Sequence, residues 1–199
     1  MEDYYYTLTE HSEGIFKDRG SKFIAHAFPV ETEEQIAVHL ANLRKQYYDA
    51  RHHCYAYMLG IDRTKFRAND DGEPNNSAGQ PILGQIKSFE LTNVLIVVIR
   101  YFGGTLLGVG GLVNAYKTAA KEAIEANKII KKNIELPLSI SFDYPLINAV
   151  NLVVKEEELS VLKRNFEASC EMQVGIKRSK FEKIKQRFEK IHGITIKNS

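Results

Sequence analysis

Residues 94–116 read VLIVVIRYFGGTLLGVGGLVNAY, and we work outward from this stretch. Residues 94–99 are all apolar and are followed by Arg100, a pattern typical of a central strand that is covered on both faces. Five glycines then fall within the nine residues 103–111. From Gly111 onward apolar side chains recur at helical spacing, which predicts an amphipathic helix over residues 111–127. The order is therefore strand, glycine-rich loop, helix.

The glycine-rich loop is a candidate anion site, because free amides and the positive end of the helix dipole meet where a helix begins. A cation and two aromatic rings precede it and are suited to grip a phosphate or stack a base. The predicted site consists of Arg100, Tyr101, Phe102, Gly103, Gly104, Gly108, Gly110 and Gly111. The alternative is structural: the glycines permit tight turns and close packing, the rings pack in the core, and Arg100 forms an ion pair. The loop lacks the lysine of a Walker A motif and does not match the dinucleotide fingerprint.

The segments before this strand read as an alternation of strands and helices. We predict a strand over residues 21–30, a helix over 31–48 and a second strand over 53–61. Residues 66–81, FRANDDGEPNNSAGQP, show neither period and are crowded with Asn, Asp, Gly and Pro, so we expect a surface loop. A short helix over residues 81–91 follows, with a proline near its start.

Two polar clusters in this region are candidates for chemistry. Asp70, Asp71 and Glu73 would suit a hard cation such as Mg²⁺, although Asx turns at a loop tip explain the same residues. His52, His53 and Cys54 include zinc-ligand types, but neighbours on a strand point to opposite faces, so the three cannot converge. We predict no metal and no cofactor.

The hydrophobic period changes after residue 127, and we place a domain boundary near Lys131, giving domains 1–130 and 131–199. The second domain reads as strand, helix, two strands around Ala168-Ser169, helix and strand. This βαββαβ order is the split βαβ arrangement of a ferredoxin-like domain. The expected fold class is thus α+β with two domains.

Composition is that of an ordinary globular chain of 199 residues, with 44% hydrophobic and 26% charged residues. No apolar run approaches a membrane span and the first residues are polar, so we expect a cytoplasmic protein without a membrane partner and with both cysteines reduced. The net charge of +2 is concentrated in the last third of the chain. Lysines and arginines there form a candidate phosphate-binding patch or, alternatively, a solvated helix face. The predicted patch consists of Lys177, Arg178, Lys180, Lys183 and Arg187.

Four strings, RGSKFIA, RHHCYAY, DDGEPNNSAGQPIL and NVLIVVIRYFGGTLLGVGGLVNAY, closely resemble the IMPACT family and its bacterial YigZ-type members. The resemblance implies an N-terminal domain similar to the ribosomal protein S5 domain 2-like α/β sandwich. It also implies a C-terminal ferredoxin-like domain that looks like the last domain of elongation factor G. Members usually read DGEPSGTAG where this chain reads DGEPNNSAG, so Asn76 stands in place of a glycine.

For the bacterial members the resemblance suggests association with RNA or the ribosome, and we take a translation-associated binding protein as the leading hypothesis. Beside the anion site, a supporting loop would consist of His53, Asp71, Gly72, Glu73, Ser77 and Gly79. One alternative is a metal-assisted hydrolase of a phosphate ester or small peptide, with Asp70, Asp71 and Glu73 acting near His53. The other is a protein-interaction module that pairs through the C-terminal sheet. Binding is favoured over catalysis.

Overall fold

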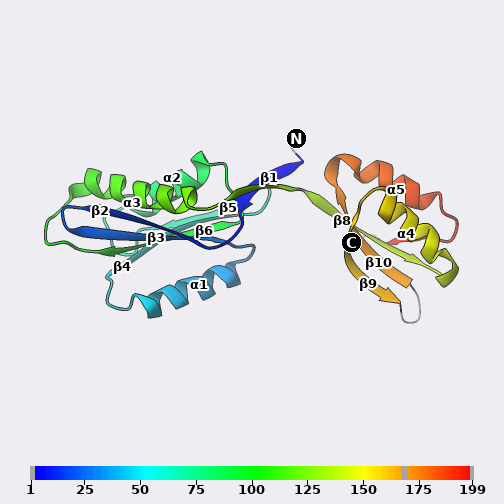
Figure 1. The fold of residues 1–199 in the computed structure, drawn as a ribbon, viewed down its shortest axis with the longest axis horizontal. Helices are drawn as coiled ribbons and strands as arrows, with labels where there is room; N and C mark the ends of the chain where they lie inside the picture. The colour runs from blue at the N-terminus through cyan, green and yellow to red at the C-terminus, as the bar shows by residue number, and fades with distance from the viewer. Residues whose placement is uncertain (1–2, 167–169, 198–199) are drawn as a thin grey trace. The chain divides into compact units, whose positions relative to one another are not determined.

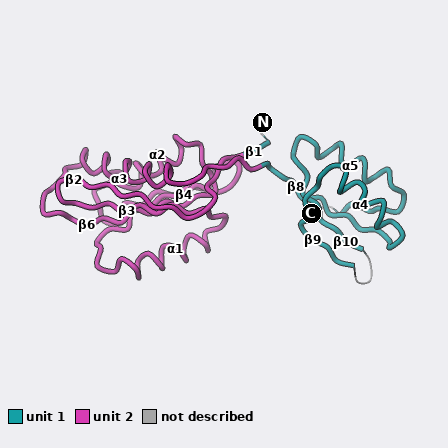
Figure 2. Tube along the Cα trace, viewed as in Figure 1, with its two compact units in different colours: residues 1–4, 133–199 teal, residues 5–132 magenta. Residues whose placement is uncertain are grey.

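A computed structural model describes residues 3–166 and 170–197 (Figure 1). The chain divides into two compact units, residues 5–132 and residues 133–199 together with 1–4 (Figure 2). The turn expected at Ala168-Ser169 lies outside the described residues. None of the described helices is long and apolar enough to cross a lipid bilayer.

The larger unit is built on a five-stranded antiparallel sheet with the strand order β2-β3-β6-β4-β5. The strands are β2 (Ser12–Asp18), β3 (Ser21–Pro29), β4 (His52–Leu59), β5 (Lys65–Asn69) and β6 (Val94–Tyr101). Its helices are α1 (Glu33–Gln46), α2 (Gly79–Ser88) and α3 (Gly108–Glu125). The all-apolar strand β6 occupies the centre of the sheet, as its composition predicts.

Helix α1 covers one face of this sheet, and α2 and α3 cover the other (Figure 1). Because side chains alternate along a strand, β6 contributes to both hydrophobic cores. Val94, Ile96 and Val98 lie in the core beneath α2 and α3, while Leu95, Val97 and Ile99 lie in the core beneath α1. Arg100, the next-to-last residue of β6, thus follows a segment that is packed on both faces.

Several predicted limits in this unit differ from the structure, and two of the differences have a clear physical reason. Residues 65–69, whose last four residues were assigned to a loop, form β5 and pair with β4 along Tyr55↔Asn69 to Leu59↔Lys65. Lys65, Phe66 and Arg67 are all exposed, so this edge strand has no alternating hydrophobic pattern to detect. Helix α3 begins at Gly108, three residues earlier than predicted, because glycine, although a weak helix former, is tolerated in the exposed first turn.

The smaller unit follows a short two-stranded sheet formed by β1 (Tyr4–Leu8) and β7 (Ile129–Asn133). It holds a four-stranded antiparallel sheet in the order β11-β8-β10-β9. Its elements are β8 (Glu135–Phe142), η1 (Tyr144–Leu146), α4 (Ile147–Glu156), β9 (Ser160–Phe166), β10 (Cys170–Lys177), η2 (Arg178–Lys180), α5 (Phe181–Glu189) and β11 (Thr195–Lys197). The order of strands and main helices is the predicted strand, helix, strand, strand, helix, strand. The molecule is mixed α/β, and the two fold-family names stay predictions.

Candidate functional site

A cavity of about 620 Å³ lies where β6 ends and β4 begins. Two arginines, a histidine and aromatic and aliphatic side chains line it. The lining residues are Asp49, Ala50, Arg51, His52, Arg100, Tyr101, Phe102 and Leu106. Three of the predicted anion-site residues, Arg100, Tyr101 and Phe102, therefore share one cavity.

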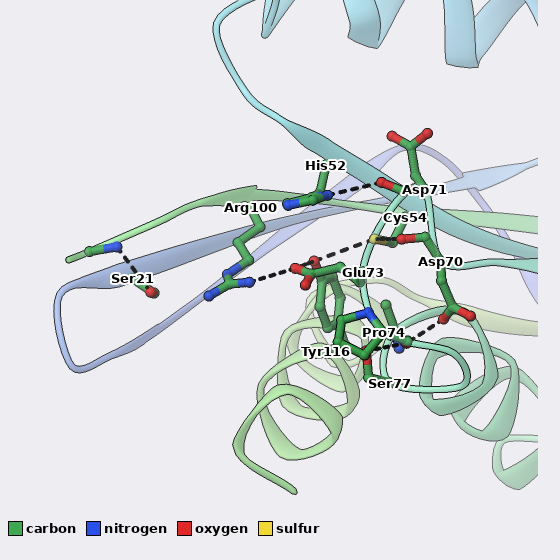
Figure 3. A network of polar contacts seen from close by, with 12 residues as sticks. Ser21, His52, Cys54, Asp70, Asp71, Glu73, Pro74, Ser77, Arg100 and Tyr116 are labelled. Carbon is green, nitrogen blue, oxygen red and sulfur yellow. Dashed lines mark hydrogen bonds and ion pairs between the residues drawn. The ribbon is translucent and has the colours of Figure 1, made fainter. Parts of the chain in front are cut away.

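Arg100 is buried and forms an ion pair with a buried carboxylate. Its Nη1 donates to Oε1 of Glu73 at 2.7 Å, and the two side chains are only 8% and 4% exposed. The same carboxylate oxygen accepts a hydrogen bond of 2.7 Å from the hydroxyl of Tyr116 on α3 (Figure 3). Two donors on one oxygen fix Glu73, and Glu73 in turn fixes the direction of the guanidinium. Arg100 thus has the structural partner that the alternative interpretation anticipates, while it still lines the cavity.

The rest of the Arg100 guanidinium faces aromatic rings. Its central carbon lies 5.7 Å from the ring centroid of Phe102 and 5.6 Å from that of Phe23. Nε of Arg100 is buried and has no hydrogen-bond partner among the described residues. The Phe102 side chain is 55% exposed, so one ring is held against a cation and is open to solvent.

The Tyr101 hydroxyl donates a hydrogen bond of 2.7 Å to Asp49 at the other side of the cavity. This hydrogen bond is the main cause that raises the pKa of Tyr101 to about 12, with burial adding to it. The hydroxyl thus keeps its proton and donates it to Asp49, whose carboxylate is engaged by this contact. Arg51 is exposed at the same rim.

The predicted glycines serve different purposes. A Cβ on Gly103 would lie 1.9 Å from the carbonyl carbon of Gly20, so this glycine lets the loop pass against the β2–β3 turn. Its amide donates to the Ser21 hydroxyl at 3.1 Å (Figure 3). Gly104 has φ +88° and Gly108 has φ +70°, the left-handed region that favours glycine. Gly110 has neither a close neighbour nor a positive φ: a Cβ there would meet nothing within 4 Å. The structure therefore does not require glycine at this position.

Helix α3 begins in this loop without a side-chain cap. Gly108, Val109 and Gly110, its first three residues, are exposed. The first amides of a helix lack partners within the helix, so this end presents donors and the positive end of the dipole to solvent. Gly111 is half-buried against Leu107.

The start of helix α2, in contrast, is already occupied by a carboxylate. Oδ1 of Asp70 accepts hydrogen bonds from the amides of Ala78 (3.0 Å) and Gly79 (2.8 Å), and Oδ2 accepts one from Asn76 (2.9 Å). Asn76 has φ +63°, a left-handed conformation that asparagine tolerates better than most residues other than glycine. Ser77 donates to the carbonyl of Pro74 at 2.6 Å (Figure 3). Ser77 and Gly79 are both buried.

Asp71 holds this loop to α1 and β4. Oδ1 accepts from Arg44 at 2.9 Å, and Oδ2 accepts from the amide of His53 at 2.7 Å. Burial opposes the effect, but these two donors lower the pKa of Asp71. The three carboxylates of the proposed hydrolase thus have separate partners, and among the described residues they form no cluster of potential metal ligands.

His52 and His53 point to opposite faces of β4, as the strand period predicts. His52, which the predicted site omitted, lines the cavity, and its Nδ1 lies 2.9 Å from the carbonyl oxygen of Asp71 (Figure 3). His53 is buried on the other face; burial and, next, the charge of Arg44 lower its pKa. Gly72, with φ +88°, packs against the His52 ring. His52 is paired with Arg100 in the sheet, so the two side chains lie on the same face. This pairing is what places His52, rather than His53, at the cavity.

Arg51, Asp49, Ala50 and Leu106 are the other cavity residues that the sequence did not predict. Leu106 is 81% exposed. The first three lie in the segment before β4, and nothing in a single sequence places that segment beside the end of β6.

Cys54 lies in the larger core, with its Sγ 3.0 Å from the carbonyl oxygen of Asp70 and 3.3 Å from the hydroxyl oxygen of Tyr116. Its single S–H can donate to one of them at a time. Burial raises the pKa of this thiol, although the hydrogen bond with Tyr116 opposes the effect. A buried, protonated thiol is a poor nucleophile, so Cys54 has a structural role.

The predicted basic patch belongs to the smaller unit and is partly neutralised. Arg187 on α5 forms ion pairs with Glu156 and Glu157, and Lys180 lies 4.0 Å from Glu157. Lys177 ends β10, Arg178 lies in η2 and Lys183 is exposed on α5. The helix buries Ile184 and Phe188, and Lys183 lies on its exposed side.

Comparisons with known proteins assign this architecture to a family. A family model described as the Impact N-terminal domain matches residues 19–124. The IMPACT family member YvyE of Bacillus subtilis is 31% identical over 169 residues, 85% of this chain and 78% of that protein. The IMPACT family member YigZ of Escherichia coli is 29% identical over 84% of this chain and 82% of its own. A crystal structure of a protein described only as hypothetical is 23% identical, with a TM-score of 0.77, over 98% of this chain and 97% of that one.

Proposed function

The chain belongs to the IMPACT family, and we propose that it acts in translation as a binding protein for RNA or the ribosome. The cavity at the end of β6 would be the binding site. One observation carries the proposal: an exposed aromatic ring, Phe102, is held against the guanidinium of Arg100 at the mouth of a cavity that Arg51 also lines.

This arrangement suits a single-stranded nucleic acid. Bases stack on exposed aromatic rings, and each such contact contributes about 1–3 kcal/mol. The cavity volume of about 620 Å³ lies within the usual range for small-ligand sites and is sufficient for a nucleotide. Arg51, exposed at the rim, would meet a phosphate, while the uncapped start of α3 would present amides to the next one.

Arg100 has a narrower role than the sequence suggests. Because Glu73 already pairs with its charge, Arg100 would orient the Phe102 ring and contribute little net attraction for phosphate. The electrostatic attraction at the cavity would come from Arg51. The cations of the smaller unit, among them Lys177 and Lys183, would be a separate contact for phosphate.

The test is a salt titration of binding to fluorescent single-stranded RNA by the full chain. We expect Phe102→Ala to weaken binding about 5- to 150-fold, the equivalent of one lost stacking contact, with an unchanged salt slope. Arg51→Ala should reduce the slope of log affinity against log salt by about 0.7, as expected for one phosphate contact.

Matched controls are available on β5, outside the cavity. Phe66→Ala removes another exposed phenyl ring, and Arg67→Ala removes another exposed arginine. Neither should change binding by more than about twofold. Equal losses in the control and cavity variants, or no RNA binding at low salt, would reject the proposal.

The alternatives have less support. The carboxylates of the hydrolase hypothesis are engaged separately, as described above. A protein-interaction role for the C-terminal sheet is supported by a groove of about 470 Å³ on that sheet. Its lining includes Lys163, Arg164 and Lys197 together with apolar and acidic residues. These three cations are equally suited to contact the phosphates of a nucleic acid, so the groove does not favour a protein partner.

A further inference from the structure

Three potential metal ligands lie side by side at the edge of the larger sheet, away from the cavity. His11 directly precedes β2, Glu13 lies within β2, and His26 lies opposite Glu13 on β3. The register of an antiparallel pair brings opposite side chains on one face within contact distance. None of the three lines the cavity at the end of β6.

Their ligand atoms converge on one point. Nε2 of His11 lies 2.9 Å from Nδ1 of His26, Oε1 of Glu13 lies 3.5 Å from that Nδ1, and it lies 3.9 Å from Nε2 of His11. In a tetrahedral zinc site with bonds of about 2.0–2.1 Å, neighbouring ligand atoms are about 3.3 Å apart. The three observed separations bracket this value. Among the described residues, this is the cluster in which three potential ligands meet.

We propose that His11, Glu13 and His26 bind one divalent transition-metal ion of the Zn²⁺ class, with a fourth coordination position open to solvent.

The donor set selects this class of ion. Two imidazole nitrogens and one carboxylate oxygen suit Zn²⁺ and its neighbours, whereas Mg²⁺ and Ca²⁺ prefer sites made of oxygen alone. His11 and Glu13 are about half exposed and His26 is 1% exposed, so the site is anchored inside and open outside. An open side is where a water molecule or another ligand would bind the metal.

The outer contacts hold the histidines in place for binding. Nε2 of His26 lies 3.0 Å from the hydroxyl of Tyr47, which leaves Nδ1 directed at the cluster. Metal-binding histidines regularly use their second nitrogen in this way. The His11 ring stacks on Phe28 at 4.5 Å between centroids, and His39 stacks on Phe28 at 4.1 Å. Phe28 therefore separates His39 from the site.

The protonation states are compatible with metal binding. Burial lowers the pKa of His26 to about 4, with Glu13 acting against this effect and His11 adding to it. At 2.9 Å, one of the two facing nitrogens carries the hydrogen and the other accepts it. For a metal to bind, that hydrogen would have to be carried by the opposite nitrogen of its own ring. Both rings then stay neutral, and each of the two facing nitrogens has a lone pair for the metal.

The test uses the full chain, stripped with a chelator and titrated with Zn²⁺ in competition with a chromophoric chelator. We expect one ion per chain, a melting temperature that rises with Zn²⁺ and not with Mg²⁺, and a Co²⁺ absorption spectrum of tetrahedral intensity. His11→Ala and Glu13→Gln should each weaken Zn²⁺ binding at least about tenfold, since loss of even an outer contact costs about 10- to 100-fold.

Because His11 and Glu13 are exposed, these variants test the site without removing the buried His26. His39→Ala is the matched control, since it removes an imidazole from the same surface but not from the cluster, and it should retain Zn²⁺ affinity and the Co²⁺ spectrum. Zn²⁺ binding that is equally strong in wild type, His11→Ala and Glu13→Gln, or that is lost equally in His39→Ala, would overturn the assignment. So would the absence of stoichiometric binding. These measurements contain no RNA, so their outcome is independent of the proposed function.

Discussion

At the scale of single residues, the most informative contact is the buried pair of Arg100 and Glu73. The sequence raised both a ligand-binding and a structural role for Arg100, and the geometry combines the two. Glu73 pairs with the positive charge of Arg100 inside the protein, and the Phe102 ring lies against the same guanidinium at the cavity. A buried charge is costly unless it is paired. Because Glu73 already neutralises Arg100, the arginine adds little net electrostatic attraction for a charged ligand.

Removing one member of this pair should be costly. Glu73→Gln leaves the guanidinium without its counter-charge, and we expect the free energy of unfolding in urea to fall by about 3–5 kcal/mol. The double variant Glu73→Gln, Arg100→Gln should lose clearly less than the sum of the two single variants, because no unpaired charge is left behind. Additive losses would show that the two side chains are not coupled.

His53 is a residue whose protonation should matter for stability. Burial and Arg44 lower its pKa in the folded protein, with Asp71 opposing and His52 adding a smaller effect. The unfolded chain, with a histidine pKa near 6.5, therefore binds more protons below that pH. Stability is then highest above pH 6.5 and declines as the pH falls below it.

The measurement is urea unfolding at pH 7 and at pH 5 for wild type and for His53→Phe. Wild type should lose more stability between the two pH values than the variant, because the variant lacks the His53 imidazole. The other buried histidine, His26, is present in both proteins and cancels from the comparison. Equal losses would mean that His53 takes no part in the pH dependence.

At the scale of elements, the passage from β6 to α3 shows why a run of glycines is hard to interpret. Gly103 is required by a close approach, Gly104 and Gly108 by their backbone angles, and Gly110 by neither. The same residue type thus marks a loop at one end of the run and the first turn of a helix at the other.

This difference predicts opposite outcomes for one substitution at two positions. Gly103→Ala should destabilise the protein, because its Cβ would lie 2.2 Å from the Ser21 amide nitrogen, on backbone that cannot move aside. Gly110→Ala should leave stability unchanged or raise it by up to about 1 kcal/mol, since alanine is the better helix former. Thermal unfolding of the two variants beside wild type measures both. A loss at Gly110 as large as that at Gly103 would contradict the distinction.

At the scale of the whole molecule, each of the two units encloses its own hydrophobic core. The larger unit holds two clusters on the two faces of its sheet, and the smaller unit holds one, centred on Phe188, Ile184 and Met172. A core residue therefore supports the unit in which it is buried.

We expect Phe188→Ala to destabilise the smaller unit by about 3–5 kcal/mol, the usual cost of removing a buried ring. Hydrogen exchange followed by mass spectrometry should show faster exchange in β8 and β10, while protection in β6 stays as in wild type. Ile96→Ala is the reciprocal variant and should reverse the pattern. Loss of protection in both units from either substitution would mean that they unfold as one.

The sequence by itself determined the elements that have a strong local pattern. The apolar run of β6 and the amphipathic α3 follow from side-chain periodicity, which is a property of neighbouring residues. The family resemblance rests likewise on contiguous strings, and the comparisons confirm it.

Only the tertiary structure decided which distant side chains meet. Glu73 reaches Arg100 across 27 positions, Tyr116 reaches Glu73 across 43, and His26 meets His11 through the register of two strands. Edge strand β5 is defined by its partner rather than by its own exposed residues. Such contacts depend on how the sheet pairs and how the loops pass over it, and no local periodicity encodes them.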